Sequence, residues 1–402
     1  MFSRLSRLSR HSRGLSAAAA LGGGATACGC AAQALAEPSD EQQRSKTVYR
    51  RLQPAESLGL GGSNAHFACF RGTGERAALS EVLAAADSAE CVILGETHDD
   101  PVAHQLELYL LMALQERRPC VLSLEMFERD VQTALDEYLR GLIREADMLQ
   151  DARPWANYEK DYRPMVEFAK AHGVPVAAAN VPRRYVGAIG RASGTLERRD
   201  AWPASAYELL PPLPLPKPSP PYMDHLLADP AVLRTDQLGI DAPAATPAPA
   251  AAAAATATAA APVASSSAAA NAAAARACEE AAVAQKAARC PYIGLSKREG
   301  LVAPMMLWDA GMAHSIAASL AAHPERLVVH VCGSFHCEWR LGIAEMLEAS
   351  YRPGAKALVV VICPEDDCDT FDAERHGGRA DFVVLTDARL PRSHDYFRMG
   401  GS

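Results

Sequence analysis

Six short segments, each apolar on both faces, limit the folds that this chain can adopt. They are rich in β-branched residues and are bounded by polar or turn-forming residues. A run that is apolar on both faces suits a strand covered on both sides, as strands are in a parallel sheet. The segments are CVILG (91–95), CVLSLEM (120–126), PVAAAN (175–180), RLVVHVCG (326–333), KALVVVIC (356–363) and ADFVVLT (380–386).

Amphipathic stretches separate these segments. Their apolar residues recur at spacings of three and four, which predicts helices over 102–118, 161–173 and 305–323. Gly173 lies where the second of these helices should end. The alternation of strands and helices predicts an α/β fold with a mainly parallel central sheet flanked by helices.

One change in composition interrupts this pattern. Residues 211–222 read PPLPLPKPSPPY. Further on, residues 242–275 carry no charge and are mostly alanine. Such a segment buries too little apolar surface to offset the entropy of ordering, so we expect a flexible stretch at about 235–275. It belongs to a Pro/Ala-rich, low-complexity insert over 207–289, which we expect to be disordered. The insert separates two halves of one domain, 47–206 and 290–402.

The N-terminal segment has the composition of a targeting sequence. Its first 36 residues contain no Asp or Glu, and Arg4, Arg7, Arg10 and Arg13 recur among serines. A basic, serine-rich start without acids is typical of organelle transit peptides. We therefore expect residues 1–46 to be a transit peptide and linker for the mitochondrion or the chloroplast. The arginine periodicity favours the mitochondrion, and a disordered basic tail is the alternative.

The net charge, the hydropathy and the cysteine pattern argue against three classes of protein: nucleic-acid binders, transmembrane proteins and disulfide-framed proteins. A net charge of −8 gives no electrostatic reason to expect binding to nucleic acid. No run of eighteen strongly apolar residues is present, so we expect no transmembrane segment. The 11 cysteines are an odd and scattered set, which is not the pattern of a disulfide framework.

Polar side chains follow four of the predicted strands. Glu96 and His98 follow the first, Glu125 ends the second, Asn180 ends the third and His336 follows the fourth. Ligands bind outside the carboxyl ends of the strands in open parallel sheets, so these side chains should share one edge. A single residue of this kind is often a helix cap, but a carboxylate within an apolar run must be paired or bound to a metal. Two imidazoles and two carboxylates suit Zn²⁺, Mn²⁺ or Fe.

Longer motifs around these residues resemble a known family. The motifs are LGETHDD, SLEMFERDVQ, WANYEKDYRPMVEFAKAHGVPVAAANVPRRYV, WDAGMAHSI and HVCGSFHCEWRLGI. Together they are similar to the ChaN-like haem-binding uptake family, which belongs with the Tiki metalloproteases and the erythromycin esterases. The resemblance covers 86–200 and 290–390, and it skips the N-terminal segment and the insert.

The resemblance implies a polar cleft and two activities. The cleft of the superfamily is built around a GExH motif, here Glu96 and His98, and a later GxxH motif, here Gly333 and His336. Glu125 matches the acidic position between them. Tiki relatives are metal-dependent proteases, whereas ChaN-like lipoproteins bind haem as dimers with tyrosine ligation. A homodimer is therefore expected here too, although this chain lacks the lipobox cysteine of those lipoproteins.

We favour haem or iron binding as the function. Haem needs an axial ligand, an apolar slot and cations for its propionates. Tyr158, Tyr162 and Tyr185 are the candidate tyrosines, and Arg183 and Arg184 could meet the propionates. The sequence contains no CxxCH motif, which excludes covalent haem attachment of that kind.

The alternative is a metal-dependent hydrolase acting on peptides or esters. His98, His336 and Glu125 would hold the ion, and Glu96 would take the proton from water, although the two glutamates could exchange roles. A scaffold or metal-storage protein using the same edge is a third hypothesis. Asp309, in WDAGMAHS, is expected to face the same interior.

Overall fold

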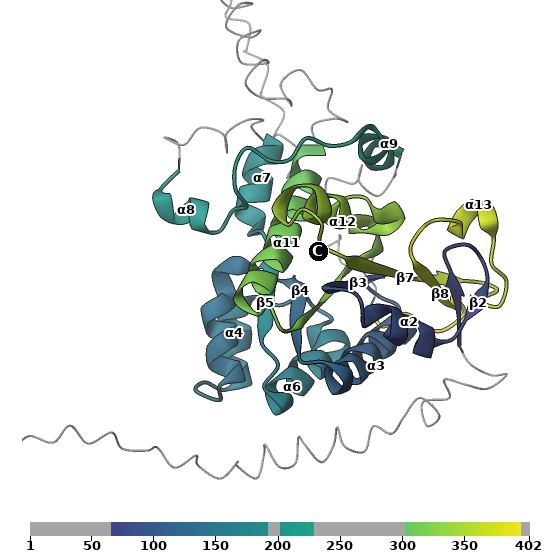
Figure 1. The fold of residues 1–402 in the computed structure, drawn as a ribbon. Helices are drawn as coiled ribbons and strands as arrows, with labels where there is room; N and C mark the ends of the chain where they lie inside the picture. Colours follow the sequence, from purple (N-terminus) through teal and green to yellow (C-terminus); the bar gives the residue numbers. More distant parts are fainter. Residues whose placement is uncertain (1–65, 192–201, 229–301, 395–402) are drawn as a thin grey trace, which may run out of the picture.

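The computed structural model of the protein describes residues 66–191, 202–228 and 302–394. The transit segment predicted for residues 1–46 and the flexible stretch predicted for about 235–275 lie outside these ranges. The described residues form a central sheet with helices on both faces, as Figure 1 shows. The α/β prediction is therefore confirmed.

The central sheet has eight strands in the order β2-β1-β8-β7-β3-β6-β4-β5. Neighbouring strands from β8 to β5 are parallel, whereas β1 pairs antiparallel with both β8 and β2. All six predicted strands are present, and the hairpin of β1 and β2 was not predicted. The strands are β1 (Phe67–Arg71), β2 (Arg76–Ala77), β3 (Cys91–Glu96), β4 (Cys120–Glu128), β5 (Val176–Asn180), β6 (Leu327–Gly333), β7 (Ala357–Glu365) and β8 (Phe382–Asp387).

Strands from the two halves of the chain alternate within this sheet. β3, from the first half, lies between β7 and β6 of the second half, and β6 in turn lies between β3 and β4. Cys91 of β3 is opposite Val328 of β6 on one side and Ala357 of β7 on the other. The two halves therefore build one sheet and cannot be separate domains.

Helices cover both faces of the sheet, and the three predicted helices are present as α3, α6 and α11. α3 begins at Pro101, because the carboxylate of Asp100 accepts hydrogen bonds from the amides of Val102 and Ala103. α6 ends at Gly173, which has the left-handed conformation that a helix end favours (φ 64°). The helices are α2 (Leu79–Ala86), α3 (Pro101–Arg117), α4 (Gln132–Leu139), α5 (Glu145–Ala152), α6 (Arg163–His172), α7 (Arg183–Arg191), α8 (Ala204–Glu208), α9 (Pro220–Ala228), α11 (Val302–Ala322), α12 (Ile343–Met346) and α13 (Ala373–His376).

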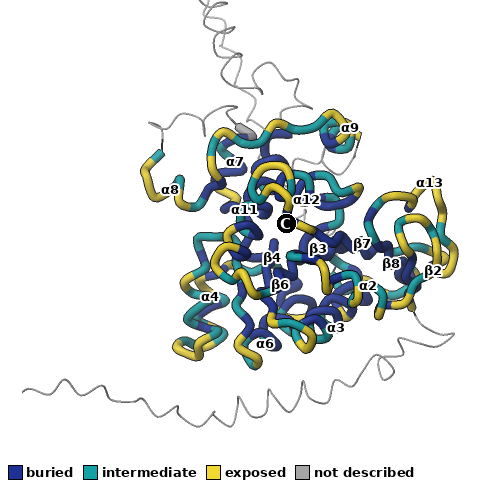
Figure 2. Tube along the Cα trace, viewed as in Figure 1, coloured by how far each residue is buried: buried dark blue, intermediate teal, exposed yellow. Residues whose placement is uncertain are grey.

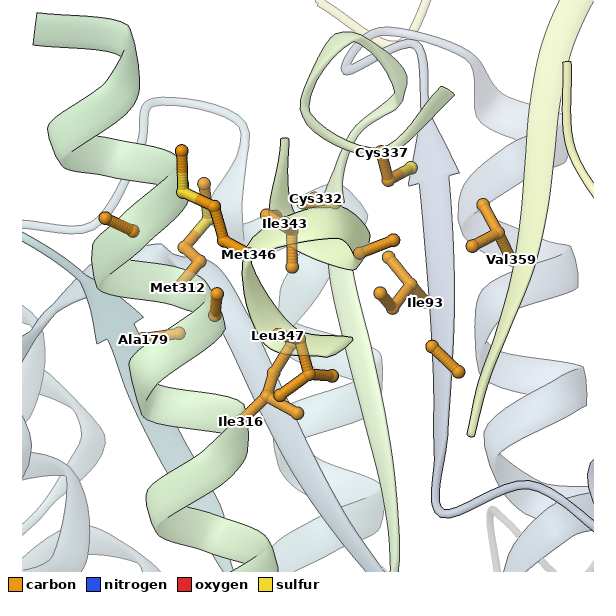
Figure 3. Packing of buried hydrophobic residues seen from close by; sticks show 14 of the residues in the cluster. Ile93, Ala179, Met312, Ile316, Cys332, Cys337, Ile343, Met346, Leu347 and Val359 are labelled. Carbon is orange, nitrogen blue, oxygen red and sulfur yellow. The ribbon is translucent and has the colours of Figure 1, made fainter. Parts of the chain in front are cut away.

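Successive residues of each central strand enter different cores. Ile93 and Val359 pack with α11 and α12 in one core, which Figure 3 shows. Leu94 and Val360 pack with α2, α3 and α6 in the other core. The central strands are therefore buried along both faces, as Figure 2 shows, which explains why their sequences do not alternate between apolar and polar residues.

The segment predicted as the insert has a described part, residues 207–228. This part contains α9, whose Tyr222 and Leu226 are buried in the core that α11 covers. The proline-rich stretch is ordered here because these two side chains bury apolar surface against the domain. α9 lies above α11 and α12 in Figure 1, close to the carboxyl ends of the strands.

Candidate functional site at the carboxyl ends of the strands

The strand register brings the predicted residues to one rim. β3 and β6 are parallel neighbours, and Glu96 lies directly opposite Gly333. A Cβ atom on Gly333 would lie 2.9 Å from both Cε1 and Nε2 of His98 and 3.6 Å from Cδ2 of His336. The two imidazoles therefore lie against the same glycine, one from each half of the chain.

Glu125 joins this rim from the other side of β6. The pairing of β4 with β6 ends at Leu124, and the pairing of β4 with β5 shifts after the same residue. Glu125 therefore leaves the regular ladder, and its Oε2 accepts a hydrogen bond of 2.7 Å from the amide of Gly333. Its Oε1 lies 3.6 Å from Nε2 of His336.

His98 is oriented by a buried carboxylate. Its Nδ1–H donates a hydrogen bond of 2.7 Å to Oε1 of Glu96, and its side chain is 31% exposed. Burial lowers the pKa of His98, but the hydrogen bond to Glu96 and the charge of Glu125 outweigh burial and raise it. The ring of Trp155 packs perpendicular to the imidazole, with 4.8 Å between centroids. Nε2 is therefore the nitrogen through which His98 can meet a metal.

His336 is held in the same way by a second buried carboxylate. Its Nδ1–H donates to Asp309 of α11, which also accepts a hydrogen bond from the hydroxyl of Tyr222. Burial lowers the pKa of His336, but the charges of Asp309 and Glu125 outweigh it and raise the pKa to about 9. Gly342 is required beside this pair, since a Cβ there would lie 2.7 Å from Oδ2 of Asp309 and its φ is 55°.

The two imidazoles and Glu125 have the ligand types of a metal site, but the structure does not bring their ligand atoms into one group within 4.8 Å. Each imidazole has its Nδ1 bonded to a carboxylate, which fixes the ring and makes Nε2 a better ligand. His98, His336 and Glu125 would supply two nitrogens and one oxygen, a set that suits Zn²⁺, Mn²⁺ or Fe²⁺. Glu96 lies behind His98, where it bonds to His98 and accepts a hydrogen bond of 2.6 Å from the hydroxyl of Tyr162. Its position suits orienting His98 better than taking a proton from water.

A second polar cluster lies beneath the rim and was not predicted. Within the described ranges, Glu96, His104 and Glu107 are the one group of metal-ligand type whose ligand atoms lie within 4.8 Å of one another. Nδ1 of His104 is 3.1 Å from Oε2 of Glu96 and 3.3 Å from Oε2 of Glu107. Burial and the charge of Glu96 raise the pKa of Glu107 well above its ordinary value. Burial therefore favours the neutral form of Glu107, while His104 lies between the two carboxylates.

The spacing of these residues could have revealed the second cluster. His104 and Glu107 are three residues apart in α3 and share the buried face of that helix with Leu110 and Leu111. A polar residue whose spacing places it on the apolar face of a helix is buried, so it needs a polar partner in the core. The positions of His104 and Glu107 therefore indicate a buried polar cluster.

The predicted haem tyrosines are all buried. Tyr162 is fully buried and bonded to Glu96, and the ring of Tyr158 packs perpendicular to that of Phe127 in the core beneath α3 and α6. Tyr185 packs on Trp202 in the other core. A tyrosine that ligates haem iron must present its oxygen at the haem surface, so these side chains do not fit that role here.

The two predicted arginines lie near the rim but point to different partners. Arg184 forms an ion pair with Asp130. Arg183 lies over the ring of Trp155, with 5.8 Å from its guanidinium carbon to the ring centroid, and its side chain is 55% exposed. Arg183 therefore lies beside the aromatic neighbour of His98 and remains accessible to an anionic ligand.

The fold and the rim together define an α/β protein with a carboxylate-oriented histidine centre at the carboxyl ends of a mainly parallel sheet. The chain belongs to the family of haem-binding uptake proteins of the Tiki superfamily, ChaN, whose model matches residues 82–347. None of the curated proteins matches the chain. No helix in the described ranges is long and apolar enough to cross a membrane.

Two solved structures illustrate what the chain trace is similar to. ChaN of Campylobacter jejuni, solved with cofacial haem, is 13% identical, with a TM-score of 0.48, and the match covers 80% of this chain and 97% of that one. A mutant of the erythromycin esterase EreC in its open conformation is 11% identical, with a TM-score of 0.37, and the match covers 77% of this chain and 78% of that one.

Proposed function

We propose that this protein binds haem at the rim, with His98 as the residue that meets the iron. The observation that carries the proposal is the state of His98, which is partly exposed and has its Nδ1 held by the buried Glu96. His336 and Glu125, whose side chains are only 8% and 6% exposed, lie too deep for a flat macrocycle to reach. Membership of the haem-binding family supports the same ligand.

The surroundings of His98 suit the other parts of a haem. Trp155 presents an aromatic surface beside the imidazole. Arg183 is exposed next to Trp155, and its one ion pair among the described residues is a long contact of 3.9 Å with Glu128. Its guanidinium could therefore form a charge-assisted pair with a propionate. When bound, haem would supply an iron centre for storage, transfer or redox chemistry.

A second candidate function is metal-dependent hydrolysis of peptides or esters. The observation that favours it is the convergence of His98, His336 and Glu125 around Gly333. An ion held there would supply the Lewis acidity that activates water. Glu125 would serve either as the third ligand of the ion or as the group that accepts the proton from water, and Glu96 would orient His98.

Three variants separate the two functions. His98→Ala should abolish both hemin binding and uptake of Zn²⁺, Mn²⁺ or Fe²⁺. His336→Ala should abolish uptake of the ion and leave hemin binding intact, whereas Arg183→Ala should weaken hemin binding alone. His172→Ala is the matched control, because His172 is an exposed histidine at the end of α6. Hemin titration followed by the Soret band, and metal analysis of the same proteins, give the two readouts.

The outcomes contradict the proposal in a defined way. If hemin gives no saturable spectral change, or if His98→Ala binds hemin as tightly as the unchanged protein, haem binding at His98 is wrong. The second function would be established instead by two results together. The unchanged protein would bind a stoichiometric metal ion and hydrolyse a peptide or ester, and His336→Ala would lose the ion.

We also propose that the protein is directed to an organelle by residues 1–46, on the basis of their basic, acid-free composition. A fusion of these residues to a fluorescent protein should accumulate in mitochondria or in chloroplasts. A diffuse cytosolic signal would contradict this proposal.

A further inference from the structure

A pocket of about 730 Å³ lies at the free edge of the sheet, beside β5. Its walls come from α4, from the end of α6 and from the second half of α11, which surround β5 in Figure 1. Pockets of 300 to about 1,000 Å³ are the size that small organic ligands occupy. The pocket runs from Gly173 and Val176, at the start of β5, to Arg129, which follows the carboxyl end of β4. None of the residues Glu96, His98, Glu125, Asp309 and His336 lines it. The pocket is therefore separate from the histidine centre.

The pocket contains an arginine that has no acidic partner. Arg129 makes its bonds through Nε and Nη2, to the carbonyl oxygen of Gly311, Nδ1 of His314 and the hydroxyl of Ser315. All three partners are neutral acceptors, and within the described ranges no carboxylate forms an ion pair with this guanidinium. Burial lowers the pKa of Arg129 to about 10, so the group stays charged at neutral pH. A partly buried cation without a counter-ion attracts an anion.

The other walls combine apolar surface with charged side chains of both signs, since Asp136, Glu208, Arg140 and Lys170 also line the pocket. Leu139, Val176, Ala178, Ala318 and Ala322 contribute apolar surface to the pocket. A simple inorganic anion would leave this surface in contact with water. A carboxylate attached to an aliphatic chain would pair with the arginine and cover the apolar walls.

The free edge of β5 is partly closed to an added peptide strand by the side chain of Gln132. The side-chain amide of Gln132 donates to the carbonyl oxygen of Val176 (2.8 Å) and accepts from the amide of Ala178 (2.7 Å). Two of the outward bonding groups that an added strand would need are therefore already occupied.

We propose that this pocket is a second ligand site, which binds an aliphatic carboxylate with its head group at Arg129. The guanidinium of Arg129 recognises the carboxylate, and the alanine-rich face of α11 packs on the aliphatic chain of the ligand. The proposal does not depend on haem or metal binding at the rim. It is tested with octanoate, with octanol as the neutral analogue and with inorganic phosphate as the simple anion.

The experiment is isothermal titration of the full-length protein and three variants. Arg129→Gln removes the cation, and Ala318→Trp fills the pocket from an exposed position without touching Arg129. Ala321→Trp is the matched control, because Ala321 is exposed on the same helix but does not line the pocket. Octanoate should bind saturably, and both Arg129→Gln and Ala318→Trp should weaken it by at least about tenfold. Ala321→Trp should leave the affinity unchanged.

Three results would overturn the proposal. Octanol binding as tightly as octanoate would show that the arginine is not used, and phosphate binding as tightly would show that the apolar walls are not used. An unchanged octanoate affinity in Ala318→Trp would place the ligand elsewhere. If Arg129→Gln does not fold, the result for Ala318→Trp alone decides whether octanoate binds in this pocket. Hemin titration of Ala318→Trp should match the unchanged protein, which separates this site from the rim.

Discussion

Replacing Asp309 with asparagine tests whether Asp309 and His336 form a charged ion pair. Asp309 is fully buried, and it bonds to both His336 and Tyr222. The pKa of His336 is raised from 6.5 to about 9, chiefly by Asp309 and Glu125 acting against burial. At about 1.36 kcal/mol per pKa unit, that difference corresponds to about 3 kcal/mol of stability. Asparagine keeps the shape of the side chain but removes the charge.

The sign of the pH dependence follows from the raised pKa. The stabilisation is fully present below pH 6.5, where His336 is protonated in both the folded and the unfolded chain, and it is lost as the pH rises through 9. Asp309→Asn removes one of the two charges behind this shift, so it should lower the free energy of unfolding by on the order of 1–3 kcal/mol at pH 6 and by markedly less at about pH 9.5.

Urea denaturation at several pH values, with chelator present, measures this difference. Asp151→Asn is the matched control, since Asp151 is exposed on α5 and should change the stability by less than about 0.5 kcal/mol at every pH. A loss in Asp309→Asn that is the same at pH 6 and at pH 9.5 would show that His336 does not carry a proton in the folded protein. The reasoning about the centre would then be refuted.

Three further predictions concern the rim and the core. Gly333→Ala should push the ring of His98 away, because the new Cβ would lie 2.9 Å from Nε2, and hemin or metal affinity should fall on the order of tenfold in the titrations above. Tyr162→Phe removes the hydrogen bond to Glu96 and should cost about 2 kcal/mol in urea denaturation; no measurable loss would show that this bond does not stabilise the fold. Leu124→Ala, in the fully buried part of β4, should cost about 2–5 kcal/mol, and a loss below 1 kcal/mol would contradict the packing described.

The strands were predictable because burial on both faces leaves a continuous apolar run. VILG in β3 and VVHV in β6 have no polar residue facing solvent, so the sequence itself records their central position. The order of the strands was not predictable, since the pairing of β3 with β6 joins residues more than two hundred positions apart. The hairpin of β1 and β2 was missed because β1 is short and finds its partner, β8, only in the folded chain.

The residues at the rim were visible in the sequence, but their partners were not all visible. The convergence of His98, Glu125 and His336 followed from one rule, that parallel strands end at a common edge. Asp309 was expected to face the same interior, and the structure shows that it bonds to His336. Tyr222 could not be found, because it lies in a proline-rich segment whose composition favours disorder.

The centre lies where the two cores of the protein meet at the edge of the sheet, and each imidazole is anchored from a different core. His98 is held by Glu96, which is buried against Tyr162 in the core beneath α3 and α6. His336 is held by Asp309 of α11, on the opposite face. The relative position of the two imidazoles therefore depends on the packing of both helical layers. A change in one layer, such as a shift of α9 with its hydrogen bond to Asp309, would move one imidazole against the other and alter any ligand that both contact.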